Sequence, residues 1–187
     1  MIDRDYVAGL IIKEADKYVG QKETDGQNRS ELIDSINKLM QANLGSPYCQ
    51  SGCYYVVDKV CQKNGWINPL PKTPSTQDAW YTSDQKYVKR LGSKSDIAYW
   101  QSTTDSSRGH AGLLREDQIL HHFKTIEFNT DSTGSREGGG VWYKSRTITG
   151  TDSLSFLGFV DVAQWILDSN SLLPSNNYGS DFRLATG

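Results

Sequence analysis

The chain of 187 residues has no long hydrophobic run: no apolar stretch approaches the ~18 residues that a membrane-spanning helix needs. It has no cluster of Lys and Arg, and its formal net charge is −2, so general affinity for nucleic acid is not expected. The first residues lack the basic and apolar regions of a signal peptide. We therefore expect synthesis in the cytoplasm, and a substrate outside the cell would require another means of delivery.

Cysteine is also scarce. The three residues Cys49, Cys53 and Cys61 lie within one short segment, and their odd number argues against a disulfide framework. Neither a Cys-x-x-Cys pair nor a His-Glu-x-x-His motif is present, so the usual signatures of a zinc site are missing. We expect no metal and no cofactor.

Apolar residues at helical spacing predict helices over 5–19 and 29–42. A third helix is expected from the Ser-Pro pair at 46–47 to the Asn-Gly pair at 64–65, because Ser caps helices well and Pro suits their first position. This helix places Cys49 in its first turn. A proline-containing loop follows, with a short helix expected near 75–81.

After about residue 95 the pattern changes to short runs that are typical of β-strands, separated by turn residues. The predicted strands are 96–101, 110–115, 119–129, 140–147 and 156–160. Helices first and an antiparallel sheet later indicate an α+β fold. We expect a single catalytic domain over 1–168, with a helical part at 1–82 and a sheet part at 95–160. A loosely held tail is predicted for 169–187, and a monomer is expected.

The position of Cys49 favours nucleophilic chemistry, because the free N–H groups and the dipole of a helix N-terminus lower the pKa of a thiol. A cysteine hydrolase also needs an imidazole within reach and a third polar group to orient it. His110 lies between glycines at the start of a predicted strand. Glu127 and Asn129 on the next strand share a face, since side chains alternate with a period of two. Either of them could orient the histidine.

Four segments in this order resemble the CHAP and NlpC/P60-type domains, the bacterial and phage branch of the papain-like cysteine peptidases. Gly-Ser-Pro-Tyr-Cys at 45–49 is similar to the family's Gly-x-Pro-aromatic-Cys. Ser-Asp-Ile-Ala-Tyr-Trp at 95–100 and Gly-His-Ala-Gly-Leu-Leu at 109–114 resemble the strands before and at the family's histidine. Thr-Ile-Glu-Phe-Asn-Thr at 125–130, with the Gly-Gly-Val-Trp-Tyr strand at 139–143, resembles the strands that follow it.

This resemblance implies a papain-like α+β fold and a hydrolase that cuts amide bonds of bacterial peptidoglycan, either an amidase or an endopeptidase. It assigns Cys49 as nucleophile, His110 as base, and Asn129 or Glu127 as the group that orients the imidazole, with Asn129 preferred as the direct partner. Peptidoglycan is the expected partner, and the site of action is the cell wall or periplasm after release or delivery. Cell-wall lysis, as by a phage endolysin, is the expected setting.

The sequence departs from the family pattern at several positions. Phe128 stands where the family often has Gly, and Gln50 and Ser51 replace small apolar residues after the cysteine. The acidic calcium loop that some CHAP domains have is absent, so no calcium is expected. Two alternatives stay open: a non-catalytic cell-wall-binding or structural module with the same fold, and an amide hydrolase that acts on an intracellular peptide or protein.

Overall fold

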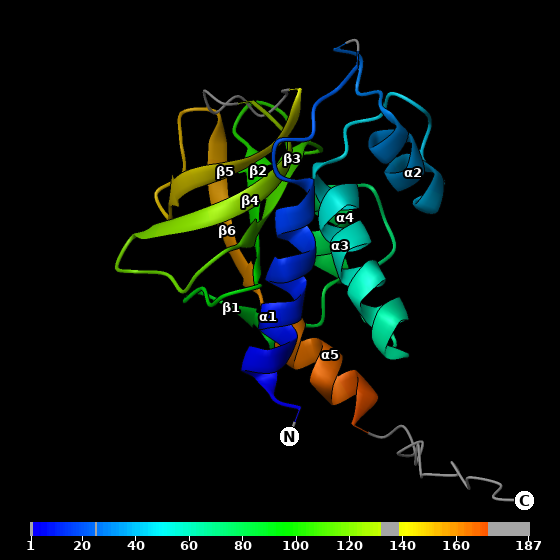
Figure 1. Ribbon diagram of the computed structural model, residues 1–187. Helices are drawn as coiled ribbons and strands as arrows, with labels where there is room; N and C mark the ends of the chain where they lie inside the picture. Colours follow the sequence, from blue (N-terminus) through cyan, green and yellow to red (C-terminus); the bar gives the residue numbers. More distant parts are fainter. Residues whose placement is uncertain (1, 25, 132–138, 172–187) are drawn as a thin grey trace, which may run out of the picture.

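The computed structural model describes residues 2–24, 26–131 and 139–171, which form an α+β fold (Figure 1). The described helices are α1 (Arg4–Ala15), η1 (Asp16–Tyr18), α2 (Glu31–Leu39), α3 (Cys49–Asn64), α4 (Thr76–Thr82), η2 (Gln85–Tyr87) and α5 (Val162–Asn170). The described strands are β1 (Val88–Lys89), β2 (Ile97–Ser102), β3 (Gly109–Leu114), β4 (His122–Thr130), β5 (Gly140–Thr147) and β6 (Leu154–Val160). No helix among the described residues has both the length and the apolar character needed to cross a bilayer.

The four predicted helices are present, but the third begins later than expected. Its first residue is Cys49, with Tyr48 as N-cap, and the predicted start at the Ser-Pro pair is wrong. Ser46 lies instead in a turn, where its N–H donates to the carbonyl of Asn43 over 3.1 Å. The buried Tyr48 side chain holds the chain in a non-helical conformation just before the helix. Cys49 is therefore the first residue of α3, closer to the helix end than the sequence indicated.

The six strands form one antiparallel sheet in the order β1-β6-β2-β3-β4-β5. The five predicted strands correspond to β2–β6, whereas the two-residue β1 and the helix α5 were not predicted. Asp161 caps α5 by accepting from the N–H of Gln164. This helix runs to Asn170, past the predicted domain boundary at 168, and the rest of the predicted tail, 172–187, lies outside the described residues.

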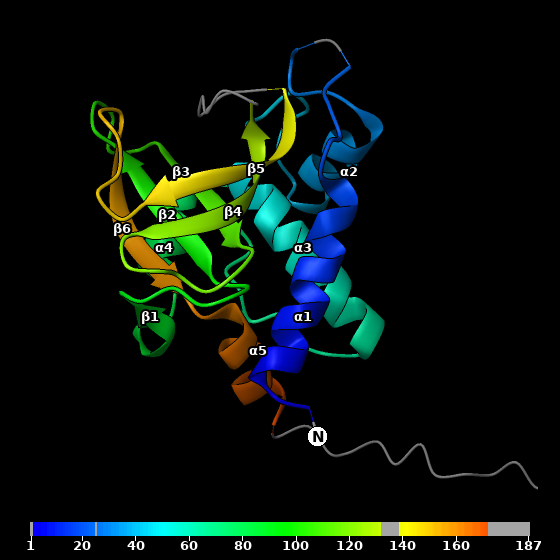
Figure 2. The same ribbon diagram turned by 60° about the vertical axis from the view of Figure 1, so that its left-hand side comes forward.

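Helices cover one face of the sheet. α1 and α3 run side by side next to it, and α3 packs on β3 and β4 (Figures 1 and 2). The large core between helices and sheet includes Tyr99, Ala111, Leu113, Ile126 and Phe128. The alternate strand positions face the other way and form a second, smaller core of Ala98, Trp100, Leu114, Phe123, Leu154 and Phe159. Both faces of the central strands are thus buried, and polar side chains there need partners inside the protein.

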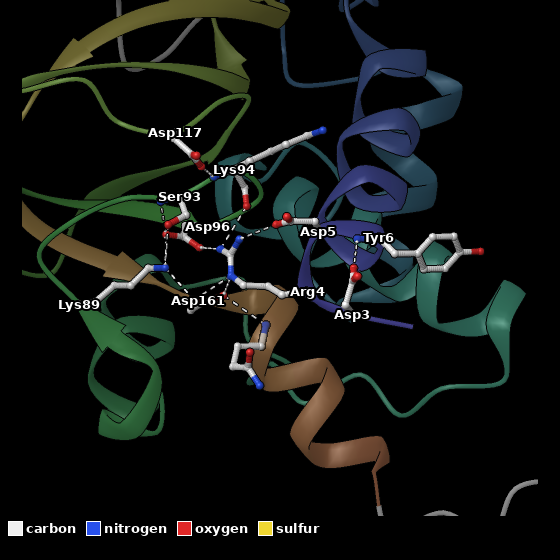
Figure 3. A network of polar contacts seen from close by, with 11 residues as sticks. Asp3, Arg4, Asp5, Tyr6, Lys89, Ser93, Lys94, Asp96, Asp117 and Asp161 are labelled. Atoms are coloured by element: carbon white, nitrogen blue, oxygen red, sulfur yellow. Dashed lines mark hydrogen bonds and ion pairs between the residues drawn. The ribbon is translucent and has the colours of Figure 1, made fainter. Parts of the chain in front are cut away.

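An ion-pair cluster of Arg4, Lys89, Asp96 and Asp161 joins α1, β1, the turn before β2 and the start of α5 (Figure 3). Arg4 reaches Asp161 over 3.0 Å and Asp96 over 2.9 Å, and Lys89 lies 3.0 Å from Asp96. Burial raises the pKa of the Asp96 carboxyl to about 7, although the nearby Lys89 opposes the shift. The cluster ties the first helix to the sheet at the end of the molecule where α5 begins.

Candidate active site

Cys49 lies at the N-terminus of α3, nine-tenths buried, with 7% of its surface exposed. The first intrahelical bond runs from the N–H of Gly52 to the carbonyl of Tyr48, so the amides before Gly52 have no acceptor within the helix. Burial opposes ionisation of the thiol, but contact with His110 and the backbone amides of Gln50 and Ala111 outweigh it and lower the pKa of Cys49. The helix start thus favours a thiolate.

His110 is fully buried on β3, opposite Trp100 of β2. Its Nε2 lies 2.8 Å from Oε2 of Glu127, while Nδ1 has no hydrogen-bond partner of good geometry among the described residues. Since Nε2 is hydrogen-bonded to Glu127, Nδ1 is the nitrogen that can exchange a proton with Cys49. Burial lowers the pKa of the imidazole, but Glu127 and Cys49 more than offset this and raise it to about 9. The surroundings favour an imidazolium beside a thiolate.

Glu127 is fully buried on β4 and accepts hydrogen bonds from three of the described side chains. These are His110, Thr125 at 2.6 Å, and Arg146 of β5, whose Nε and Nη2 lie 2.8 and 2.5 Å from the two carboxylate oxygens. Burial favours the neutral acid, but Arg146 and His110 hold the pKa of Glu127 far below its usual range. The carboxylate is therefore ionised and fixed in orientation.

Position 112 of β3, two residues after His110, has room only for a glycine. A Cβ at this position would lie 2.6 Å from Cγ of Glu127. His110 and Gly112 share one face of β3, and the Glu127 side chain crosses that face to reach the imidazole. The Gly-His-Ala-Gly segment thus supplies the imidazole together with the space for its carboxylate partner.

The expectation that Asn129 is the direct partner of His110 is wrong, because Glu127 occupies that place. The pairing of β4 with β5 shifts register between Phe128 and Thr130, and Asn129 there adopts a left-handed backbone with φ of 55°. This bulge breaks the alternation that was expected to bring Glu127 and Asn129 to the same neighbour. Asn129 instead lines the cleft in front of Cys49, and its buried Oδ1 has no hydrogen-bond partner among the described residues.

An open cleft of about 660 Å³ gives access to Cys49. Its lining comes from the segment before α3, the start of α4, the turn before β3, and Asn129. The described lining residues are Gln41, Ala42, Asn43, Ser46, Pro47, Cys49, Pro74, Ser75, Thr76, Ser107, Arg108, Gly109 and Asn129. Cys49 is part of this lining, whereas His110 is fully buried beside it.

The remaining cysteines and histidines lie outside this arrangement. Cys53 is fully buried one turn further along α3, and burial raises the pKa of its thiol well above the usual value. Burial also raises the pKa of Cys61 to about 12. His121 and His122 are exposed at the start of β4. Within the described parts of the chain, no three His, Cys, Asp or Glu side chains are grouped so that they could hold a metal ion.

Arg146 is the residue of this site that sequence reasoning missed. The period of two places residues 142, 144 and 146 of β5 on one face, but Trp142 is paired in register with Glu127, and Arg146 with Phe123. Lys144 is nearer than Arg146 to Glu127 in the strand register, yet its Nζ donates to the carbonyl of Asp131. Only the side-chain packing selects Arg146, so strand periodicity alone gave no signal to prefer it.

Comparisons with known proteins leave the family of the chain open. No family model and no curated protein matches it. Among solved structures, the chain is similar to the crystal structure of a wild-type endolysin, LysIME-EF1, with 17% sequence identity and a TM-score of 0.46. The match covers 86% of this chain and 64% of the endolysin chain. The function of this chain has to be inferred from its own residues.

Proposed function

We propose that the chain is a cysteine hydrolase that cleaves amide bonds of bacterial peptidoglycan in cell-wall lysis, as an endolysin does. One observation carries the proposal: a thiol at a helix N-terminus opens into a cleft and lies near an imidazole whose Nε2 is held by a buried carboxylate. This is the set of groups that nucleophilic catalysis by cysteine requires.

The proposed reaction runs in two halves. His110 takes the proton of Cys49, and the thiolate attacks the carbonyl carbon of the scissile amide. Amides at the start of α3 stabilise the oxyanion, the C–N bond breaks, and His110 gives its proton to the leaving amine. Water then attacks the thioester carbonyl and passes a proton to His110. The C–S bond breaks, the acid product leaves, and His110 returns the proton to the thiolate of Cys49. Glu127 orients the imidazole throughout.

Peptidoglycan is proposed as substrate on the resemblance of the four sequence segments to CHAP and NlpC/P60-type domains. The open cleft suits an extended ligand better than a small enclosed one, and its lining is mainly polar and neutral apart from Arg108. Both the glycan–peptide amide and a peptide cross-link fit this description. An amidase would release intact stem peptides, whereas an endopeptidase would release cut cross-links.

The test is to incubate the full chain with purified peptidoglycan and to identify the released fragments by mass spectrometry. New amine and carboxyl ends are expected with the wild type and not with Cys49→Ala. Alkylation of Cys49 by iodoacetamide serves as a control that needs no substrate. Fast alkylation without fragments would overturn the choice of substrate, and slow alkylation without fragments would favour the non-catalytic module.

A further inference from the structure

Arg146 makes the most extensive side-chain contact with Glu127. Its Nε and Nη2 donate two parallel hydrogen bonds to the two carboxylate oxygens, a geometry that fixes orientation as well as charge. The Arg146 side chain is only 9% exposed, and its guanidinium lies 5.6 Å from the ring centre of Trp100. The guanidinium is therefore held by its hydrogen bonds to Glu127 and by its contact with the ring of Trp100.

The charges of the site alternate from the cleft inward: Cys49, His110, Glu127 and Arg146. When Cys49 is a thiolate and His110 an imidazolium, the net charge of the four groups is zero. In the proposed acyl-enzyme the sulfur carries the acyl group and the imidazole is neutral, so Glu127 keeps one negative charge in a buried place. Burying an unpaired carboxylate costs free energy. Arg146 pairs with Glu127 both in the thiolate–imidazolium form and in the acyl-enzyme, so the carboxylate is never left unpaired.

The other titratable groups that the structure describes near Glu127 do not supply this charge. Cys53 of α3 is near enough to interact with the charge of Glu127, but burial raises the pKa of its thiol, which stays neutral near pH 7. Asp131 faces Arg146 from the end of β4 and is itself acidic. Thr125 donates to the carboxylate as a neutral hydroxyl. Arg146 is thus the cation that compensates Glu127 when His110 is neutral.

We propose that Arg146 is a positioning residue of the catalytic site: it holds the Glu127 carboxylate toward His110 and balances its charge while His110 gains and loses a proton. This inference rests on the proposed function for its catalytic meaning, but it concerns a contact that can be tested without any substrate. Arg146 is not among the residues that line the cleft, and its hydrogen bonds to the site go to Glu127.

The experiment measures the rate of Cys49 alkylation by iodoacetamide from pH 4 to pH 9 in the full-length protein. Arg146→Met removes the charge, and Arg146→Lys restores it without the two parallel hydrogen bonds. Arg115→Met is the matched control, because Arg115 also lies over an aromatic ring, 4.4 Å from the centre of Tyr143, but contacts no residue of the site. Cys53→Ala together with Cys61→Ala in every variant leaves Cys49 as the one thiol of the chain, so the label reports on Cys49.

Loss of Arg146 raises the pKa of Glu127, so the carboxylate becomes neutral at a higher pH and no longer supports the imidazolium–thiolate pair. The acid-side midpoint of alkylation is expected to rise by about one pH unit in Arg146→Met, which slows the reaction about tenfold below the midpoint. Arg146→Lys should return the midpoint toward the wild type, and Arg115→Met should leave it unchanged.

In a Glu127→Gln background, Arg146→Met should cause no further shift, because its route of action is already gone. The double variant also buries no unpaired carboxylate. If Arg146→Met alone fails to fold, the comparison of Glu127→Gln with the double variant still measures the effect of Arg146. A wild-type midpoint in Arg146→Met, a Lys variant that behaves like Met, or a further shift in the Gln background would each overturn the proposal. A wild-type thiol of ordinary reactivity would instead overturn the proposed cysteine chemistry.

Discussion

The ring of Phe128 on β4 lies directly against Gly52 of α3, in the place where any other residue at position 52 would put its Cβ. Phe128 points to the helix-covered face of the sheet, whereas Glu127 points to the opposite face. A large residue before Asn129 is therefore accommodated by a glycine one turn into the helix, and it leaves the partner of His110 undisturbed.

Gly52→Ala is expected to destabilise the protein by about 1–3 kcal/mol, since the methyl group would force the ring or the helix to move. Gly9→Ala in α1 is the matched control: no atom lies within 4 Å of a Cβ there. The control is expected to gain about 0.5–1 kcal/mol from helix propensity. Urea unfolding of both variants measures this. Equal effects at the two positions would show that the Phe128 contact carries no strain.

Cys49→Ala is expected to abolish release of peptidoglycan fragments while the fold survives, because the thiol supplies chemistry more than packing. Cys53→Ala should keep substantial activity, since Cys53 is fully buried on the apolar side of α3. Fragment release and thermal unfolding are measured for both variants. Activity in Cys49→Ala, or its loss only in Cys53→Ala, would show that the nucleophile is assigned wrongly.

Glu127→Gln is expected to lower kcat/KM about a hundredfold at neutral pH. The charge of Glu127 raises the pKa of His110, so the neutral amide lets it fall and lets the pKa of Cys49 rise. The thiolate–imidazolium pair exists at pH values between the pKa of Cys49 and the pKa of His110. The variant therefore narrows the pH range of the pair at both ends. The acidic limb of the pH–rate profile should move to higher pH. An unmoved limb would remove Glu127 from the electrostatics of the site.

Asn129→Ala is expected to lower the rate with little change in the shape of the pH–rate profile. Asn129 lines the cleft and carries no charge, so its loss removes a contact to substrate and leaves the ionisation of Cys49 and His110 in place. The same assay on purified cell walls measures this. A shifted acidic limb in this variant would mean that Asn129 acts on the imidazole after all.

Arg4→Met is expected to cost about 1–3 kcal/mol of unfolding free energy, because it leaves Asp96 and Asp161 with less compensation. Folding raises the pKa of Asp96 from 3.8 to about 7, so this group favours the folded state most below pH 4, and that contribution is lost as the pH rises through 7. The cost of Arg4→Met should therefore be larger at pH 8, where Asp96 is charged, than at pH 5.

Asp5→Asn is the control for Arg4, since the Asp5 side chain is 97% exposed and lies 3.9 Å from the guanidinium. An exposed pair of this kind contributes under about 1 kcal/mol, so no measurable change is expected. Denaturant unfolding at both pH values compares the two variants. An Arg4→Met effect that is the same at pH 5 and pH 8 would contradict the account of Asp96.

Local patterns in the sequence determined most of the secondary structure. Helical spacing located α1 and α2, and alternation located β2–β6, because each element buries one face and the period of its apolar residues follows its geometry. Cap residues located α3, although not its first residue. The same local reasoning placed Cys49 at a helix start and His110 on a strand between glycines. These positions depend on turn chemistry and residue size within a few neighbours.

Which polar groups meet depends on how the strands pack in three dimensions. The bulge at Asn129 changes where its side chain goes, and a shift of one residue in register is invisible to a pattern of period two. Arg146 reaches Glu127 although its register partner is Phe123, four residues from Glu127 along β4, so strand pairing alone did not select it. Local sequence features were enough to identify the candidate nucleophile and its helix. The partner of His110, and Arg146 next to that partner, follow from how β3, β4 and β5 pack together.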